Sequence, residues 1–521
     1  MSNSSINKRY FLSSATMMGV VACSGFTGCS SEKNQQPNVI FILADDIGYG
    51  DFSCYGATRV QTPNVDRLAA SGLRFTNGHC AAGYSTPTRY ALLTGEYPFR
   101  RKDTGVAAGN AASIIRPEQK TVQAMFQDAG YTTAVVGKWH LGLGNDTEQD
   151  WGGYIAPGPK ELGFDYSYII PATGDRVPCV FIENQRVVGY NPNDPIEVSY
   201  KDPFPGEPLG RTHPELLYKQ VHSHGHNMAI VHGIGRIGYM RGGKTALWTD
   251  EYIADDITVK AVDFIDRSKD KPFFLYFATH DIHVPRYPHA RFVGKTGMGP
   301  RGDAILSFDW SIGQILNALD RNGLTKNTIV IISSDNGAVL DDGYQDQAWE
   351  LLGEHKPTGP LRGGKGSGFE GGTRMPFIVS WPAGGVPKGK TSNAAVSHLD
   401  FFASMAALTG QKLPDDAAPD SFDQLKAWLG KDLKGREYVV KQGGPLSVIE
   451  GDWKYIVPAG RENFVTGNGN ESGTSTGPQL YNLKDDIGER NNLAAEHPDK
   501  VEKLAALIEM VRKTPKTRFA R

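Results

Sequence analysis

The sequence has few cysteines, little net charge and no cluster of basic residues. Its five cysteines in 521 residues show no CxxC spacing, so neither a zinc site nor a disulfide framework is predicted. Outside the N-terminal segment only Cys54, Cys80 and Cys179 remain, and we expect each to be a small buried apolar residue. The formal net charge is -2 and lysine and arginine are scattered, which argues against binding to nucleic acid. The composition is that of a globular chain, long enough for one large domain and a smaller one.

The N-terminal segment has the pattern of an export signal. Lys8 and Arg9 precede a mildly apolar run, Tyr10–Ala22, which is too short to span a bilayer. The residues before Cys23 and before Cys29 are both similar to a bacterial lipobox. Cys29 leaves the longer apolar run and is followed at once by polar residues, so we expect lipidation there; a plain secretory signal is the alternative. We therefore expect a protein of the periplasm or cell surface that meets the membrane only through a lipid anchor.

Five short apolar runs predict the core of the fold. They are continuous rather than alternating and rich in Val, Ile and Phe, as in strands that are covered on both faces. The predicted strands are Val39–Leu43, Thr133–Val136, Phe273–Phe277, Ile329–Ile332 and Phe377–Val379. The predicted helices are Val65–Ala70, Val122–Ala129, Asp255–Arg267 and Leu306–Leu319. Strands that alternate with helices indicate an α/β sandwich around a mainly parallel sheet.

Two regions depart from this alternation. Residues 151–244 are rich in Gly, Pro, Asp and His, which predicts long loops of the kind that carries specificity. The composition changes again after Gly410. The predicted elements there are strands at Tyr438–Val440, Trp453–Ile456 and Leu480–Tyr481 and a helix at Val501–Val511. This pattern indicates a small sheet with one helix in a second domain.

Polar residues follow the predicted strands where each one ends. Asp45 and Asp46 follow the first strand, and Asp335 and Asn336 follow the fourth. Because α/β sheets bind ligands at the carboxyl ends of their strands, we expect these side chains to converge. Oxygen ligands of this kind favour calcium or magnesium over zinc. Other polar residues expected at this edge are Lys138, His140 and His283, with His280 and Asp281 either supporting their neighbours or purely structural.

Ser85 stands just ahead of a predicted helix. Pro87 suits the first helical position with Thr86 as the N-cap, and Gly95 suits the end of the helix. Free backbone N–H groups and the helix dipole favour an anion there, and Arg89, one turn along, can reach back toward it. By spacing alone, an ordinary capped helix start is the simpler explanation.

Taken together and in order, several blocks resemble the sulfatase family. Ser85–Arg89 followed by Leu93–Gly95 is similar to the family signature, although the family usually has Ser where Thr88 stands. The other similar blocks are Asn38–Gly50, Gly137–Gly142, His283–Pro285, Asp335–Gly337, Leu361–Gly366 and Glu370–Pro376. The resemblance covers nearly the whole chain after the N-terminal segment, and ordered blocks are more specific than any single motif.

The resemblance implies a fold and a division of the chain. The fold would be an alkaline-phosphatase-like α/β sandwich, with a large mixed, mainly parallel sheet between helices and a small antiparallel sheet in a C-terminal α+β domain. The parts would be a signal peptide with a lipobox at 1–29, a tether at 30–36, a catalytic domain at 37–410 and a C-terminal subdomain at 411–521.

The resemblance also implies roles for single residues. Ser85 would be oxidised to formylglycine, whose hydrate attacks the sulfur of a sulfate ester. Calcium would be held by Asp45, Asp46, Asp335, Asn336 and the modified Ser85. Arg89 and Lys138 would stabilise the hydrate, and Lys138 and Lys365 would neutralise charge on the sulfuryl oxygens. The base and the general acid would be His140 and His283, respectively.

The substrate implied by the resemblance is a sulfated carbohydrate. The 151–244 insertion is similar to that of bacterial carbohydrate sulfatases, and Asp175, Arg176 and His224 would bind sugar hydroxyls. We expect a 6-O-sulfated galactose or N-acetylgalactosamine at a non-reducing end. The neighbouring His222 and His226 lack metal-ligand spacing and could equally contact substrate or cap turns.

Two alternative functions remain open, and the serine at position 85 predicts a partner enzyme. A phosphatase or phosphodiesterase of the same superfamily would share the sheet and the carboxylates but would use two zinc ions and an unmodified nucleophile. If Ser85 is not oxidised, the protein could only bind sulfated glycans. A serine at this position predicts an anaerobic radical maturing enzyme as partner, because the oxygen-dependent route acts on cysteine.

Overall fold

The computed structural model describes residues 36–519. The predicted signal peptide, the lipidation site at Cys29 and nearly all of the tether lie outside the described residues. Within residues 36–519, no helix is both long and apolar enough to cross a membrane. Cys54, Cys80 and Cys179 are free thiols; Cys80 and Cys179 are buried and Cys54 is partly buried.

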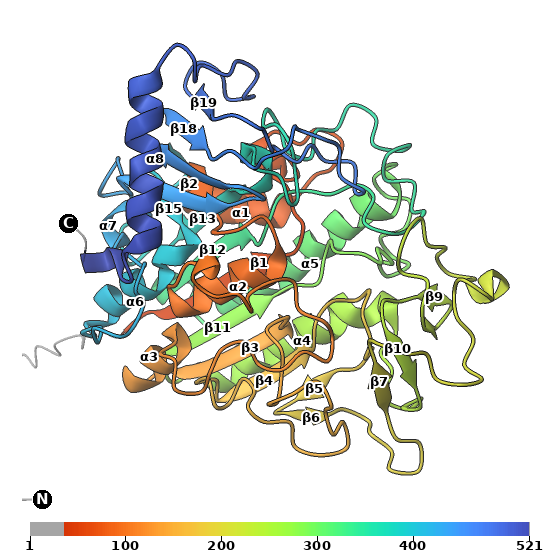
Figure 1. The fold of residues 1–521 in the computed structure, drawn as a ribbon. Helices are drawn as coiled ribbons and strands as arrows, with labels where there is room; N and C mark the ends of the chain where they lie inside the picture. The colour runs from red at the N-terminus through yellow and green to blue at the C-terminus, as the bar shows by residue number, and fades with distance from the viewer. Residues whose placement is uncertain (1–35, 520–521) are drawn as a thin grey trace, which may run out of the picture. The chain divides into compact units, whose positions relative to one another are not determined.

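An eleven-stranded mixed sheet forms the centre of the fold (Figure 1). Its strand order is β14-β2-β13-β12-β1-β11-β3-β4-β5-β6, with β15 beside β2. The parallel centre consists of β12 (Thr328–Ser334), β1 (Asn38–Ala44), β11 (Phe273–Ala278), β3 (Thr132–Lys138) and β4 (Tyr166–Ile170). The antiparallel edges include β13 (Arg374–Ser380) and β2 (Leu73–His79) on one side and β5 (Ile182–Glu183) and β6 (Arg186–Val187) on the other. The short strands β14 (Lys390–Ser392) and β15 (Val396–Ser397) complete the sheet.

Helices cover both faces of this sheet, which explains the continuous apolar strands. One layer contains α1 (Pro63–Ser71), α4 (Ile253–Ser268) and α5 (Gly299–Arg321), in which α5 contacts both α1 and α4. The other contains α2 (Ser85–Thr94), α3 (Val122–Asp128) and α6 (Phe401–Thr409). Phe41 of β1 packs edge-on against Phe401 with ring centroids 4.9 Å apart, and Phe274 of β11 stacks on Phe126 at 4.4 Å. The predicted α/β sandwich is confirmed.

A four-stranded antiparallel sheet follows near the C-terminus. Its strands are β16 (Tyr438–Gln442), β17 (Leu446–Glu450), β18 (Trp453–Ile456) and β19 (Gln479–Asn482). The helix α8 (Pro498–Lys513) lies along this sheet (Figure 1), and the short α7 (Leu425–Trp428) precedes it in sequence. The sequence predicted three of these strands and the helix, but missed β17, in which Ser and Glu interrupt the apolar residues. The domain boundary at residue 410 stays a prediction.

The 151–244 region is not made of loops alone, so that expectation is wrong in part. It contains β4, whose residues Tyr166–Ile170 pair in parallel with β3 and are almost all buried. Two small antiparallel pairs follow, β7 (Glu197–Ser199) with β10 (Tyr239–Arg241) and β8 (Ile230–Val231) with β9 (Ile234–Gly235). Tyrosine and serine in β4 break the Val- and Ile-rich pattern on which the strand predictions relied.

Candidate active site

Four predicted polar residues converge where β1 and β12 end. The register pairs Ala44 with Ser334, so the residues that follow each strand lie side by side. Asp46 donates its backbone N–H to Asp335 Oδ1 at 3.3 Å, and Asn336 Nδ2 donates to Asp46 Oδ1 at 2.7 Å. These side chains and that of Asp45 are fully buried. The strand ends therefore concentrate carboxylate and amide oxygens at one buried point.

Three cations surround these carboxylates. Lys138, the last residue of β3, donates from Nζ to Asp45 Oδ1 and Oδ2 at 2.8 and 2.6 Å. The Arg89 guanidinium donates to Asp335 Oδ2 from Nε at 3.1 Å and from Nη2 at 2.7 Å. Lys365 Nζ donates to Asp46 Oδ2 at 3.0 Å. We call these three carboxylates and three cations the sheet-end cluster.

The carboxylates of the sheet-end cluster do not ionise equally. Burial and the nearby Asp335 raise the pKa of Asp45 well above its ordinary value. Burial also opposes ionisation of Asp335, but Arg89 and Lys138 together lower its pKa to about 2. Atoms of Asp45, Asp46 and His283 lie within 4.8 Å of one another and could hold a metal ion. A divalent cation fits this set because it would relieve the repulsion between adjacent carboxylates.

Ser85 brings a hydroxyl to the same point from the start of α2. Its Oγ accepts from Lys138 Nζ at 3.0 Å and lies 3.4 Å from Asp45 Oδ1 and 3.3 Å from Asn336 Oδ1. As the first residue of a ten-residue helix, it also lies beside free backbone N–H groups. This position suits both a metal ligand and a group that holds an anion.

Two histidines complete the surroundings of Ser85. His140 hydrogen-bonds through Nε2 to Ala107 O at 3.0 Å, and its buried Nδ1 has no hydrogen-bond partner among residues 36–519. His283 hydrogen-bonds through Nδ1 to Val284 O at 2.8 Å, so Nε2 is left free to accept. Burial, followed by Lys138 for His140 and Lys365 for His283, lowers the pKa of both rings well below the ordinary value. Both rings are therefore neutral and each offers an acceptor nitrogen.

A cavity of about 150 Å³ opens over these groups. Ser85, His140, His283 and Lys365 line it together with the side chains of Tyr84, Val106, Asp175, Arg176, His226, Ile237 and Asp342. We call it the inner cavity. On its wall, Asp175 binds Arg176 Nη1 at 3.0 Å and His226 Nε2 at 2.8 Å. The cavity thus joins the sheet-end cluster to polar residues of the 151–244 insertion.

The family model described as Sulfatase matches residues 37–411. The chain belongs to the sulfatase family. It is 52% identical over 495 residues to N-acetylgalactosamine-6-O-sulfatase of Bacteroides thetaiotaomicron, covering 93% of this chain and 96% of the relative. It is 30% identical over 472 residues to arylsulfatase A of Homo sapiens, covering 88% of this chain and 83% of the relative.

A solved structure described under the metabolism of multiple glycosaminoglycans by Bacteroides thetaiotaomicron superposes on this sulfatase with a TM-score of 0.90. The two chains are 53% identical, and the match covers 92% of this chain and 99% of that one. The protein is therefore a sulfuric ester hydrolase with the fold that its sequence predicts. The comparisons favour the sulfatase over the phosphatase alternative.

The start of α2 differs from the prediction. The helix begins at Ser85 rather than at Pro87, and Thr86 is not its cap. The Thr86 hydroxyl instead donates to His140 O at 3.0 Å and accepts from the Ala107 N–H at 3.1 Å. Arg89 does not reach back to Ser85, because Asp335 and the Lys138 carbonyl oxygen engage its guanidinium. Ser85 is thus the first residue of the helix rather than a residue ahead of it.

The structure decides among the histidines of the insertion and adds Asp342, which the sequence analysis missed. His226 rather than His224 contacts Asp175 in the inner cavity, whereas the partly exposed His224 lies 3.7 Å from Asp341. Asp342 also lines the cavity and accepts from Lys365 Nζ at 2.7 Å. Alternating histidines gave no sign of which one points inward, and Asp342 lies in a loop with no motif.

His280 and Asp281 lie behind the cavity. The Asp281 carbonyl oxygen accepts from the Asp45 N–H at 3.2 Å, and the next residue, Ile282, donates its N–H to Asp45 O at 2.7 Å. His280 is buried against Gly174, where an added Cβ would lie 2.5 Å from its ring. Both residues thus contact backbone that positions Asp45 and Asp175.

Proposed function

We propose that this sulfatase removes 6-O-sulfate from N-acetylgalactosamine or galactose at the non-reducing end of a sulfated glycan. The observation that carries the proposal is the inner cavity, where the Ser85 hydroxyl faces cations on one side and Asp175, Arg176 and His226 on the other. The cations suit a sulfate group, and the ion-paired Asp175 offers acceptors for sugar hydroxyls. The 52% identity to an N-acetylgalactosamine-6-O-sulfatase supports the choice of sugar.

We infer that residue 85 acts as formylglycine and that calcium is the metal. Formylglycine would supply, as its hydrate, one hydroxyl to attack sulfur and a second whose deprotonation releases sulfate and restores the aldehyde. Calcium would be held by Asp45, Asp46, Asp335, Asn336 and residue 85, with His283 near this set. It would offset the repulsion of the carboxylates and the charge on the sulfate oxygens.

The remaining steps belong to side chains around Ser85. Lys138, whose Nζ lies 3.0 Å from Ser85 Oγ, would orient residue 85 and, with Lys365, stabilise the sulfuryl oxygens. Arg89 would hold Asp335 in place and so support the hydrate indirectly. His140, with its free Nδ1, would accept the proton of the second hydroxyl. His283 would donate a proton to the leaving ester oxygen once the charge of a bound sulfate raises its pKa.

Mass spectrometry and a regiochemical assay test this proposal. The tryptic peptide of residue 85, taken from cells with an anaerobic radical maturing enzyme, should be lighter by two hydrogens. The purified protein should release sulfate from N-acetylgalactosamine 6-O-sulfate and leave the 4-O-sulfate intact. Release from the 4-O-sulfate alone would refute the sugar assignment. An unmodified Ser85 with no turnover would favour a glycan-binding protein instead.

We also propose that the chain is exported and anchored by a lipid on Cys29. The support is the basic, apolar and lipobox-like pattern of residues 1–29. Labelled palmitate should be incorporated by the natural chain and by a Cys23→Ser variant but not by a Cys29→Ser variant. Labelling lost only in Cys23→Ser would move the anchor to that residue.

A further inference from the structure

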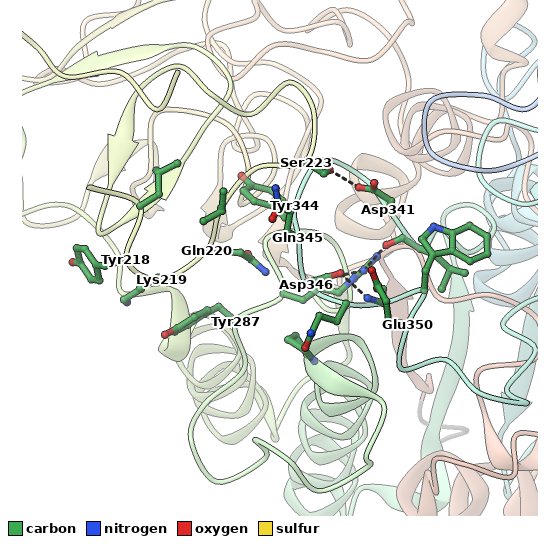
Figure 2. Close-up of a pocket in the computed structure, with 18 residues that line it drawn as sticks. Tyr218, Lys219, Gln220, Ser223, Tyr287, Asp341, Tyr344, Gln345, Asp346 and Glu350 are labelled. Atoms are coloured by element: carbon green, nitrogen blue, oxygen red, sulfur yellow. Dashed lines mark hydrogen bonds and ion pairs between the residues drawn. The ribbon is translucent and has the colours of Figure 1, made fainter. Parts of the chain in front are cut away.

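Figure 2 shows a second, larger cavity of about 710 Å³. Its walls come from residues 217–221 and Ser223, from Arg286, Tyr287 and Pro300, and from residues 340–341 and 344–350. We call it the outer cavity. The inner cavity is smaller than the usual 300–1,000 Å³ of a ligand pocket, whereas the outer cavity falls within that range. The inner cavity therefore suits the sulfated end of a glycan rather than a longer stretch of it.

The two cavities share a thin wall. His226 lines the inner cavity, and its ring centroid lies 4.7 Å from that of Tyr344, which lines the outer one. Asp341 and Asp342 are consecutive, yet Asp341 lines the outer cavity and Asp342 the inner one. Asp341 and the partly exposed His224 lie 3.7 Å apart, and His224 stands in the chain between Ser223 of the outer cavity and His226 of the inner one. We call this pair the rim. A chain of sugars that begins at Ser85 can cross this rim.

The outer cavity has the side chains that bind sugars. Tyr218 is 75% exposed and Trp349 is 51% exposed, which leaves aromatic faces open for the C–H faces of sugar rings. Gln220 is only 6% exposed, and its Oε1 is buried with no hydrogen-bond partner among the described residues. In Figure 2 the Gln220 side chain points from its strand-like segment toward Asp346, across the cavity. A buried amide oxygen without a partner favours a ligand that donates a hydroxyl.

The charges of the outer cavity disfavour a second sulfate. Its two cations are already paired, Arg286 with Asp346 at 2.8 Å and Lys219 with Glu251 at 2.8 Å. Among the described lining residues, Asp341 and Glu350 add further negative charge. Ser223 donates to Asp341 Oδ1 at 2.6 Å, which leaves the other carboxylate oxygen available to accept from a hydroxyl. The lining therefore favours hydroxyl donors over sulfate groups.

We infer that the outer cavity binds unsulfated saccharide that continues the glycan beyond the 6-O-sulfated sugar held at Ser85. This inference rests on the proposed function and adds the length and sulfation of the substrate to it. The sulfated sugar occupies the inner cavity, and the next unit crosses the rim at Asp341 and His224. It then reaches Gln220 and the aromatic faces of Trp349 and Tyr218. The enzyme accordingly prefers an oligosaccharide to the matching monosaccharide.

Substrate length and two aromatic variants test the inference. The natural enzyme, Trp349→Ala and Tyr218→Ala would each be assayed with a 6-O-sulfated monosaccharide and with its extension by unsulfated sugars. Loss of one stacked aromatic corresponds to about tenfold in affinity. We expect kcat/KM on the extended substrate to fall about tenfold through KM, with the monosaccharide unaffected. Tyr154→Ala is the matched control, because Tyr154 is an exposed tyrosine that lines neither cavity.

The outcomes separate this inference from the proposed function. Equal losses on both substrates, or no loss on the extended one, would overturn the inference while 6-O-sulfatase activity stands. A better rate when the second sugar also carries sulfate would overturn its charge argument. If no 6-O-sulfated sugar is turned over, the proposed function fails. The inference is then tested by measuring how tightly the natural protein and Trp349→Ala bind the unsulfated oligosaccharide. Weaker binding by Trp349→Ala supports it, and equal binding refutes it.

Discussion

Two buried groups of charged residues in this sulfatase differ in what lies beside them. In the sheet-end cluster, the carboxylates of Asp45, Asp46 and Asp335 adjoin one another. In a second group, which we call the Glu370 cluster, two glutamates share two lysines. Lys441 Nζ donates to Glu370, and Lys454 Nζ lies 2.9 Å from Glu370 and 2.7 Å from Glu489. Both groups are buried, so burial alone does not distinguish them.

The pKa directions of the carboxyl groups are mixed within each cluster. Burial opposes ionisation of Glu370, yet Lys441 and Lys454 lower its pKa well below the ordinary value. The pKa of Asp45 is instead raised by burial and by Asp335. Burial also raises the pKa of Glu489, so a raised carboxyl pKa does not by itself separate the two clusters. The sheet-end cluster differs because Lys365 lines the inner cavity and Asp45 and Asp46 could hold a metal ion, whereas the Glu370 cluster lines neither the inner nor the outer cavity. We therefore expect changes in the sheet-end cluster to affect mainly activity, and changes in the Glu370 cluster to affect mainly stability.

Replacement of Ser85 should have the largest effect. Ser85→Ala removes the residue that we propose is oxidised to formylglycine, so we expect sulfate release to fall by at least about 10³-fold. Ser85 Oγ accepts one hydrogen bond from Lys138 Nζ at 3.0 Å, and its contacts with Asn336 and Asp45 are longer, so the loss of unfolding free energy should be about 1 kcal/mol or less. Turnover and thermal unfolding measured on one preparation would check both. A matched Ser71→Ala control, whose hydroxyl donates to Leu68 O, should keep full activity.

Removal of the proposed metal should have the next largest effect, because the metal would be bound at the sheet-end cluster. We expect a chelator to reduce turnover about a hundredfold or more, because the positive charge of the metal would no longer stabilise the negative charge on the sulfate oxygens. It should also lower stability by about 2–3 kcal/mol relative to a hundredfold excess of calcium over its Kd. Added calcium should restore both. The melting temperature of Asp46→Asn should not respond to the chelator; a response equal to that of the natural chain would place the metal elsewhere.

Lys441→Met should have the opposite effect, a large loss of stability with little loss of activity. Removing one partner of a buried ion pair leaves Glu370 short of a cation and costs about 3–5 kcal/mol. Activity per folded molecule should stay close to that of the natural chain. Urea unfolding would measure the loss, and the exposed pair of Lys503 with Glu450 provides the control: Lys503→Met should cost less than about 1 kcal/mol. The Glu370→Gln, Lys441→Met double variant should lose less than the sum of the single changes.

The same comparison explains how much the sequence could predict. Asp45, Asp46, Asp335 and Asn336 follow continuous apolar strands, and parallel strands bring their ends to one edge. The local pattern and the rule for parallel strands were therefore sufficient to predict that these four residues converge. Glu370 meets its lysines only because β16 and β18 pack beside its loop, 71 residues or more along the chain. No local pattern encodes such a contact.

The inner cavity likewise contains residues that the sequence predicted and residues that it could not predict. Lys138, His140, His283 and Lys365 were predicted and line it or contact the residues that do. The inward turn of His226 depends instead on irregular backbone in the insertion. Its own φ is 42°, and Gly343 leaves so little room that a Cβ there would lie 1.8 Å from His226 Nδ1. Loop packing of this kind is decided by tertiary contacts, not by residue type.

His226 should give the smallest effect, and one that depends on pH. Burial opposes protonation of His226, but its hydrogen bond to Asp175 raises its pKa above the ordinary value. The charged pair is thus present at low pH and is lost as pH rises through the raised pKa. If the pair orients Asp175 and Arg176 toward the sugar, KM should rise on the alkaline side while kcat follows its own profile.

His226→Gln keeps a neutral donor but cannot titrate. We expect its KM to be raised by up to about tenfold and to be independent of pH over the range where that of the natural enzyme changes. His224→Gln, at the partly exposed rim, should keep the natural pH profile. A pH profile of KM that survives in His226→Gln would assign the titration to another group. The ion pair beside the cavity would then belong with the Glu370 cluster, as a support for the fold rather than for the substrate.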